Sequence, residues 1–317
     1  MRTVISIATL AVAVAVALAC EQTTRDKNAS AVHPSPAAGV AAAQGQKGSD
    51  AGLAGRLVAI SARARGDVGV AVVHVESGGE AAFQAEKQLP LYSVFKLPLA
   101  VVVLREVEAG RLRLDQKVRV TPEEIVPGWQ GNTDLWREPV ERTVAELLEL
   151  SIARSDNTSS DKLLSLVGGS EAVTRLTQSL GLADITIQST VREYVTQGGK
   201  NNTGSARDLA RLLAKIRKGE VLGPQQTALL LGMMERATTG VRRLRGDLPA
   251  GTKVADKTGT GENATNDVGL IALPEGRGHL AMAVLISNSK LTAGEQEKLI
   301  AELARAAYDA HSAQTKR

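Results

Sequence analysis

A serine and a lysine three residues apart form the first pair in the chain that could do chemistry. Ser93 and Lys96 lie within residues 91–98, and the segment 97–104 is almost wholly apolar, as in a buried helix. Positions i and i+3 of a helix share one face, so the lysine amine can approach the serine hydroxyl. A serine becomes a strong nucleophile when a base removes its proton, and a lysine whose pKa is lowered by burial can be that base. The pair indicates nucleophilic acyl transfer, although so short a pattern also arises by chance.

Two later segments carry polar side chains of the kinds that such chemistry needs. Residues 155–157 (Ser-Asp-Asn) follow a helix predicted to end near Arg154, and residues 257–260 (Lys-Thr-Gly-Thr) end a predicted strand. Taken singly, the first is typical of a polar helix terminus and the second of a strand that runs into a turn. Gly259 would let a ligand approach the backbone closely. The three segments in this order favour a serine acyl-transfer site over three separate structural features.

Hydrophobic periodicity and capping signals predict the elements that must position these segments. A first helix is indicated by apolar residues at helical spacing, Leu53, Leu57 and Ile60. A β-rich run over residues 68–75 and a second run over residues 81–87 predict a hairpin. Helix starts follow at polar or proline positions, which are Ser93, Thr121, Thr143, Ser170, Ser205 and Pro224.

Strands return near the end of the chain, over residues 252–257, 267–273 and 279–287, before a last helix that reaches about Tyr308. Strands from both ends must therefore share one sheet, and the short connections between the late strands predict antiparallel pairing. The expected fold is α/β (α+β), with an antiparallel sheet lobe flanked by helices. This lobe would comprise about residues 51–92 and 235–311, with an all-helical lobe of about residues 93–234 inserted between its halves.

Residues 1–20 are typical of an export signal. Arg2 supplies the positive start, residues 4–18 are mostly apolar, and small residues precede Cys20, the single cysteine. The cysteine at this boundary resembles a bacterial lipobox, which predicts a lipid tether to a membrane. Ala17 departs from the leucine usual in that motif, so ordinary cleavage before Cys20 is the alternative. Either route predicts an exported, periplasmic protein, and one cysteine permits no disulfide within the chain.

Composition excludes several other classes of function. Residues 21–50 lack apolar periodicity and predict a flexible linker. The net charge is only +4 and aromatic residues make up 2% of the chain, so nucleic-acid binding has no support. The four histidines are scattered without metal-ligand spacing. We expect no metal, no cofactor and no nucleic-acid partner, and we expect a monomer that acts on a small molecule.

The motif set resembles that of the class A serine β-lactamases, over about residues 51–310. Several stretches are similar to the extended-spectrum branch that includes the PER and VEB types, namely residues 92–97, 153–157, 238–246, 256–260 and 264–269. The resemblance implies the β-lactamase/transpeptidase-like fold and hydrolysis of β-lactams, hence antibiotic resistance. It also leaves open a penicillin-binding or other acyl-transfer protein that deacylates slowly. A non-enzymatic anchored binding module would leave the pairing of Ser93 and Lys96 unexplained.

The resemblance implies catalytic roles for individual residues. Ser93 would attack the β-lactam carbonyl to form an acyl-enzyme, and Lys96 would help to move its proton. The backbone N–H groups of Ser93 and Thr260 would form the oxyanion hole. Ser155 would relay a proton toward the leaving nitrogen.

Substrate-binding roles follow from the same resemblance. Asn157 would hydrogen-bond the side-chain amide of the substrate. Its carboxylate would be bound by the strand segment and a nearby arginine, that is Lys257, Thr258, Gly259, Thr260 and Arg243. Trp129 would be an aromatic gatekeeper beside the site or, equally, a core tryptophan.

One part of the family pattern is not clear in this chain. Class A enzymes need a glutamate that activates the deacylating water, and the candidate here is Glu193 in the stretch 190–194. A gap-free count from Gly181 instead puts Val191 at the position of the family's glutamate. The alternative for Glu193 is a solvated loop residue next to Arg192. We nevertheless expect Glu193 to be the base, because no other carboxylate follows Asp184 on that loop.

Overall fold

The computed structural model describes residues 52–127, 133–136 and 140–313. The predicted export signal, the linker over residues 21–50, Cys20 and Trp129 lie outside the described residues. Within the described residues, no helix combines the length and the apolar character that crossing a membrane would require.

One antiparallel sheet joins the two ends of the described chain. Its five strands lie in the order β2 (Glu80–Phe83), β1 (Asp67–His74), β9 (His279–Ser287), β8 (Ala264–Ala272) and β7 (Val254–Gly261). The register pairs Val70 with Val284 and Thr258 with Asp267. The prediction of an antiparallel sheet built from both termini is confirmed, and β7 forms one edge of it.

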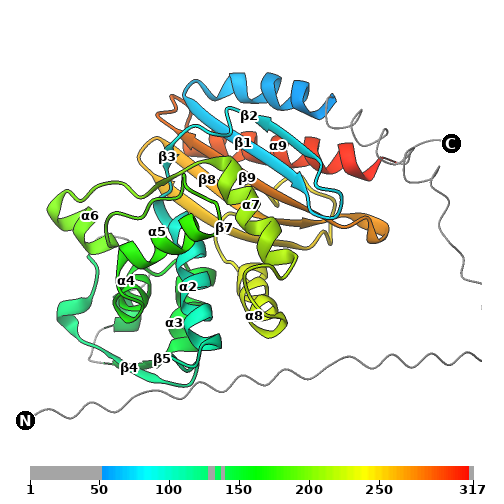
Figure 1. Cartoon of the computed structure of the whole chain (residues 1–317). Coiled ribbons are helices and arrows are strands. Elements are labelled where there is room, and N and C mark those ends of the chain that lie inside the picture. Colours follow the sequence, from blue (N-terminus) through cyan, green and yellow to red (C-terminus); the bar gives the residue numbers. More distant parts are fainter. Residues whose placement is uncertain (1–51, 128–132, 137–139, 314–317) are drawn as a thin grey trace, which may run out of the picture.

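Alternation along the strands sends side chains to two cores. In β1, Val70 and Val72 join a cluster with the helix over residues 52–61 and with α9 (Ala293–Ser312), whereas Ala71 and Val73 face the opposite side. That opposite side is covered by α7 (Ala206–Arg217), which packs on β1, β8 and β9. Figure 1 shows the sheet between these helices. Successive side chains of a strand point to opposite faces of the sheet, and both faces are buried because helices cover each of them.

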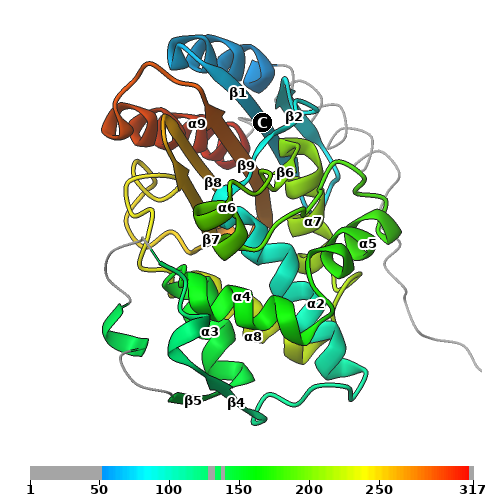
Figure 2. The same cartoon turned by 90° about the vertical axis from the view of Figure 1, so that its left-hand side faces the viewer.

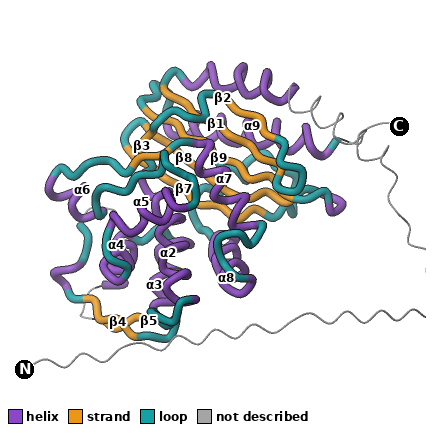
Figure 3. The backbone as a smooth tube through the Cα atoms, viewed as in Figure 1, coloured by secondary structure: helices purple, strands orange, loops and turns teal. Residues whose placement is uncertain are grey.

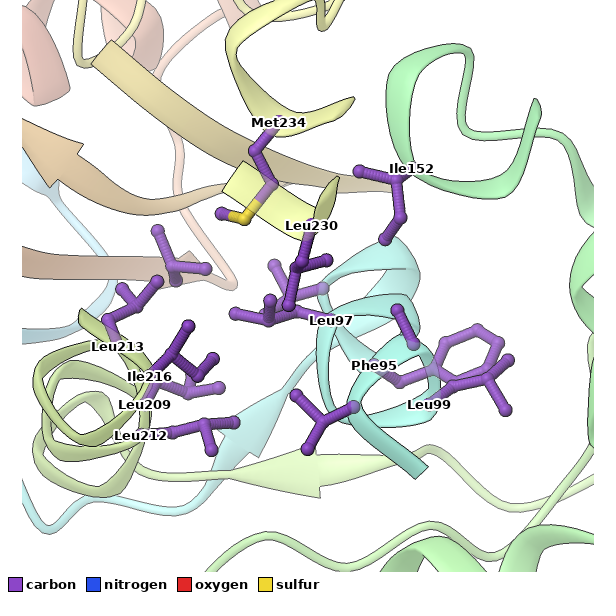
Figure 4. Close-up of a cluster of buried hydrophobic side chains, with 14 of the residues drawn as sticks. Phe95, Leu97, Leu99, Ile152, Leu209, Leu212, Leu213, Ile216, Leu230 and Met234 are labelled. Carbon is purple, nitrogen blue, oxygen red and sulfur yellow. The ribbon is translucent and has the colours of Figure 1, made fainter. Parts of the chain in front are cut away.

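The remaining helices form a region beside the sheet, built around α2 (Lys96–Glu108), which contacts α3 (Val144–Ala153), α4 (Asn157–Leu166), α5 (Ser170–Ser179) and α8 (Pro224–Glu235). Residues 96–104 of α2 are all buried, so this helix is apolar on every side rather than amphipathic. Figure 4 shows Leu97 and Leu99 of α2 with Ile152, Leu230 and Met234 from the helices around it.

Short elements complete the chain. Two small antiparallel sheets pair β3 (Leu89–Pro90) with β6 (Thr203–Gly204) and β4 (Lys117–Val120) with β5 (Val140–Thr143). The single 3-10 turns are η1 (Ala62–Ala64), η2 (Tyr92–Phe95), η3 (Pro122–Glu124), η4 (Thr133–Trp136) and η5 (Pro274–Gly276). The tube in Figure 3 shows the five-stranded sheet in one region of the molecule, whereas β4 and β5 lie beside α3 and α4 in the helical region.

Most predicted helix starts are confirmed, and the differences are local. Thr143 and Thr292 form capping boxes that open α3 and α9, and the Ser205 side chain caps α7. The capping box at Thr121 opens only η3, one 3-10 turn rather than a helix. The second strand of the first hairpin is shorter than predicted, because β2 ends at Phe83. Neither α4 nor α6 (Val191–Gln197) was predicted, since both are short and weakly periodic.

Candidate active site

A single 3-10 turn positions Ser93 at the edge of the sheet. η2 runs directly into α2, and the backbone N–H of Lys96 donates to the carbonyl of Ser93, so the two residues are one helical turn apart. Tyr92, which precedes the serine, has a φ of +47°. That left-handed conformation is unusual for a bulky residue, and such strain is concentrated at functional sites. The turn therefore presents the serine in a fixed geometry beside the helix that carries the lysine.

β7 passes so close to the segment 91–92 that a side chain would collide with it at two positions. A Cβ on Gly259 would lie 2.4 Å from the carbonyl oxygen of Leu91, and one on Gly261 would lie 2.1 Å from the ring of Tyr92. Both distances are far inside van der Waals contact. A side chain at position 259 would meet backbone and push β7 away from the serine turn, whereas one at position 261 would displace the ring of Tyr92. Gly259 thus allows β7 to pass close to Leu91, directly before the serine turn.

Lys96 is fully buried and uses its amine to hold the segment that follows α3. Its Nζ donates to the carbonyl oxygen of Ser155 at 2.6 Å, to Oδ1 of Asn157 at 2.7 Å and, more weakly, to Oγ of Ser155 at 3.4 Å. Three oxygen atoms therefore lie within hydrogen-bond distance of the amine. The lysine therefore joins the serine turn to residues 155–157.

The surroundings of Lys96 favour its neutral form. Burial lowers the pKa of Lys96 well below the ordinary lysine value, and the positive charge of Lys257 lowers it further. Asp156 and Asp161 oppose this shift, because a nearby negative charge favours the ammonium. An amine with a lowered pKa can take a proton from a hydroxyl or from water near neutral pH.

Lys257 reaches the same serine hydroxyl from the opposite side. Its Nζ lies 3.0 Å from Oγ of Ser155 and 2.9 Å from the carbonyl oxygen of Thr258. Burial lowers the pKa of Lys257 to about 7, although the carboxylates of Asp256 on β7 and Asp267 on β8 favour its charge. The hydroxyl of Ser155 therefore lies between two buried amines, and we call Lys96, Ser155 and Lys257 the lysine wall.

The turn that carries Ser155 is held by contacts that the sequence motifs did not predict. Ser155 has a φ of +58°, and the next residue, Asp156, caps α4 by accepting from N–H of Ser159 at 2.6 Å. The indole of Trp136 donates to the other carboxylate oxygen of Asp156 at 3.3 Å. On β8, the amide of Asn266 donates to the carbonyl oxygen of Pro90 at 2.8 Å and so ties the sheet to the segment before η2. Asp156, Trp136 and Asn266 are buried. Their supporting contacts could not be predicted, because the sequence motifs do not reveal which polar side chains are buried together.

Arg243 enters the site behind β7, and its exposed fraction is 7%. Its guanidinium donates to the carbonyl oxygens of Gly259 at 3.1 Å and Asn266 at 2.9 Å, and to the hydroxyl of Thr260 at 2.8 Å. Its Nε pairs with Glu297 at 3.3 Å. The arginine thus supports β7 and places a positive charge next to the threonine hydroxyl.

A pocket of about 590 Å³ opens in front of these groups, a volume suited to a small molecule. The predicted residues that line it are Ser93, Ser155, Asn157, Arg243, Thr258 and Thr260. The opposite side is formed by the start of α6, through Thr190, Val191, Tyr194 and Val195, which we call the α6 wall. Glu193 is not among the lining residues.

The structure places Glu193 apart from the other predicted catalytic residues. It is exposed, and its Oε2 accepts from the N–H of Thr190 at 2.8 Å, while its own N–H donates to the Thr190 hydroxyl at 3.1 Å. This is a capping box that opens α6. The same turn is anchored by Asp161 of α4, whose two carboxylate oxygens each accept at 2.8 Å, from N–H of Val191 and of Arg192. A cap explains the position of Glu193 without a role in the pocket.

Comparisons with known proteins agree on one family. The family model described as the β-lactamase enzyme family matches residues 52–311. The β-lactamase VEB-1 of Pseudomonas aeruginosa is 30% identical over 253 residues, which cover 76% of this chain and 84% of that protein. The extended-spectrum β-lactamase PER-1 of the same species is 37% identical over 238 residues, which cover 70% and 75%.

Solved structures agree with the sequence relatives. A β-lactamase from Chitinophaga pinensis DSM 2588 superposes with a TM-score of 0.78 at 35% identity, over 82% of this chain and 99% of that one. The TLA-1 extended-spectrum β-lactamase superposes with a TM-score of 0.78 at 31% identity, over 83% and 99%.

Proposed function

Because the chain belongs to the β-lactamase enzyme family, we propose that Ser93 is its acylating nucleophile and that the lysine wall moves the protons. The protein is a class A serine β-lactamase of the PER/VEB-like branch, and it hydrolyses β-lactam antibiotics. The observation that carries the assignment of roles is the convergence of two buried amines on the Ser155 hydroxyl. One of these amines belongs to Lys96, which follows Ser93 by one helical turn.

The acylation step follows from the contacts of the lysine wall. Neutral Lys96 takes the proton of Ser93, whose oxygen then bonds to the β-lactam carbonyl carbon. When the ring C–N bond breaks, the hydroxyl of Ser155 donates its proton to the leaving nitrogen and regains one from Lys257 or Lys96. The return of a proton to Ser155 would be short, because Ser155 Oγ is 3.0 Å from Lys257 Nζ and 3.4 Å from Lys96 Nζ.

Charge on the sheet side of the pocket would select and orient the substrate. Lys257, Thr258, Thr260 and Arg243 offer donors to a carboxylate, and the close passage of β7 would bring the N–H of Thr260 near that of Ser93 as an oxyanion hole. β7 supports this use because it is the edge strand, so its outward backbone groups have no strand partner in the sheet. Asn157, which also lines the pocket, would hydrogen-bond the side-chain amide of the substrate.

Steady-state hydrolysis of nitrocefin tests the assignment. Wild type and Ser165→Ala, an exposed serine at the end of α4, should turn the substrate over at equal rates. Ser93→Ala should be inactive while it keeps the melting temperature of wild type. Undiminished turnover by Ser93→Ala would show that Ser93 is not the nucleophile.

We also propose that residues 1–20 export the protein to the periplasm and that Cys20 carries a lipid anchor. The support is the apolar segment that ends in small residues before the single cysteine. A single lipid chain binds a membrane weakly, so stable anchoring needs more than one lipid chain. Wild type should enter the detergent phase of a partition assay and Cys20→Ser the aqueous phase; an aqueous wild type would favour ordinary cleavage.

A further inference from the structure

Thr239 lines the pocket beside β7, although the proposed reaction gives it no role. Its Oγ1 lies 2.7 Å from Oγ1 of Thr258, which lines the same pocket, and this is the usual separation of an O–H···O hydrogen bond. A threonine hydroxyl has one proton and two lone pairs. One of the two hydroxyls therefore donates to the other, and the pair keeps one proton for a third group.

The side chain of Thr258 is held at both of its ends. Its hydroxyl contacts Thr239, and its methyl packs against Gly240, where an added Cβ would lie only 2.4 Å from Cγ2 of Thr258. Gly240 has a φ of +74°, a conformation that residues with a side chain rarely adopt. These two contacts restrict rotation about the Cα–Cβ bond of Thr258, so its hydroxyl points in one direction.

The turn that carries Thr239 is anchored outside β7. The backbone N–H of Thr238 donates at 2.9 Å to the carbonyl oxygen of Ala153, the last residue of α3. The N–H of Arg243 donates at 2.9 Å to the carbonyl oxygen of Gly240 and closes the turn. The hydroxyl of Thr239 is thus brought to β7 from the helical region and does not need a ligand to hold it there.

Thr260 provides a parallel on the same strand. It lies two positions after Thr258, so the two side chains share one face of β7. The guanidinium of Arg243 donates to Oγ1 of Thr260 at 2.8 Å, which occupies a lone pair and leaves the hydroxyl proton free. Each of the two strand hydroxyls therefore has a polar group behind it, Arg243 for Thr260 and Thr239 for Thr258.

We propose that Thr239 is a positioning residue for the substrate carboxylate: it donates to Oγ1 of Thr258, so that Thr258 directs its own proton at the carboxylate. This inference rests on the proposed binding of the carboxylate at β7. Hydrogen bonds to a carboxylate are charge-assisted, and a hydroxyl that already accepts a hydrogen bond is the better donor. The effect of Thr239 on the substrate passes through Thr258.

The test compares kcat/KM for nitrocefin, which carries the carboxylate, with kcat/KM for its methyl ester. Thr239→Val keeps the shape of the side chain and should lower the value for nitrocefin about 3- to 10-fold, while the value for the ester stays within about twofold of wild type. Thr239→Ser restores the hydroxyl and should restore the preference for the carboxylate. Thr252→Val is the matched control, because it removes a hydroxyl bonded to the carbonyl oxygen of Pro249 and Thr252 is not a lining residue.

A double-mutant cycle tests whether Thr239 acts through Thr258. Thr258→Val should lower kcat/KM for nitrocefin more than Thr239→Val does, and the double variant should be no worse than Thr258→Val alone. Fully additive losses would overturn the proposal, because Thr239 would then act independently of Thr258. Melting temperatures check that each variant folds.

The outcomes separate this inference from the proposed function. If Thr258→Val weakens nitrocefin selectively but Thr239→Val behaves as wild type, the carboxylate site stands and the role of Thr239 is wrong. Equal losses for nitrocefin and its ester in Thr239→Val would also overturn that role, because the residue would then only support the structure of β7. If Thr258→Val leaves both substrates unchanged, Thr258 does not bind the carboxylate, and the proposed role of Thr258 fails together with that of Thr239.

Discussion

The lysine wall meets the pocket through Ser155 and the α6 wall lines it directly, and the two differ in burial and polarity. Both amines of the lysine wall are fully buried, and each has at least two oxygen partners. The α6 wall exposes apolar surface, with Tyr194 40% and Val195 46% accessible, and is held by backbone contacts. Buried, partly desolvated charges have perturbed pKa values and can transfer protons, whereas an apolar surface can only shape a pocket. This difference supports the proposal that the proton transfers take place at the lysine wall.

Removal of the amine of Lys96 should have the largest effect. Lys96→Met keeps the length of the side chain but leaves no base beside Ser93, so acylation should slow by about 10²–10⁴-fold. Stopped-flow nitrocefin opening measures the rate. Lys87→Met, which removes an exposed amine paired with Asp67, is the control and should acylate normally. An acylation rate within threefold of wild type for Lys96→Met would mean that another group takes the proton.

Lys257→Met should have the next largest effect, and only on substrates that carry a carboxylate. Loss of one partner of a desolvated charge pair costs about 2–5 kcal/mol, so kcat/KM should fall by that equivalent. An ester analogue without the charge should lose far less. Equal losses for the two substrates would show that the lysine serves the structure of β7 rather than the ligand.

The pH dependence of stability should reveal the buried amine of Lys257. Its pKa is about 7 in the folded protein and would be near 10.5 in the unfolded chain. Between these values the unfolded state binds more protons, so the free energy of unfolding should rise with pH from about 7 to 10 through this group. Denaturant titrations of wild type and Lys257→Met, subtracted at each pH, isolate the contribution. A difference that is flat over this window would mean that the amine keeps its proton in the fold.

The smallest effect is expected on the α6 wall. Glu193→Ala removes one capping box and should lower the free energy of unfolding by about 0.3–1.5 kcal/mol, with acylation unchanged. Glu146 and Glu295 belong to the capping boxes that open α3 and α9. Glu146→Ala and Glu295→Ala are therefore matched controls for the loss of a capping box. If Glu193→Ala also slows acylation, the two walls are not independent.

The sequence predicts the fold well because its signals are local and repeated. Capping at Thr143, Ser205 and Thr292 and the strand over 279–287 are each marked by neighbours in the chain. The role of Glu193 on α6 was harder to predict, because the sequence does not distinguish a glutamate in a capping box from one that faces a pocket. Only the direction of the helix face decides between Val191 and Glu193 as the residue that faces the pocket.

Residues of the candidate site differ in how far the sequence reveals them. Residues that belong to short motifs, such as Ser93, Lys96 and Lys257, can be proposed from their spacing. Residues that act by closing a buried network, such as Asp156 with Trp136, depend on contacts between segments 20 residues apart. Such contacts leave no local pattern in a single sequence, so the support of the Ser155 turn could only be found in the structure.

The most direct test of the central claim is the site and rate of covalent labelling by a slowly hydrolysed β-lactam. We predict that one drug mass is added to the intact protein, on the peptide that contains Ser93. Ser155→Ala should form the same adduct more slowly, because the hydroxyl between Lys96 and Lys257 no longer passes protons. An adduct on any other peptide, or an unchanged rate in Ser155→Ala, would contradict the claim that the lysine wall carries the chemistry.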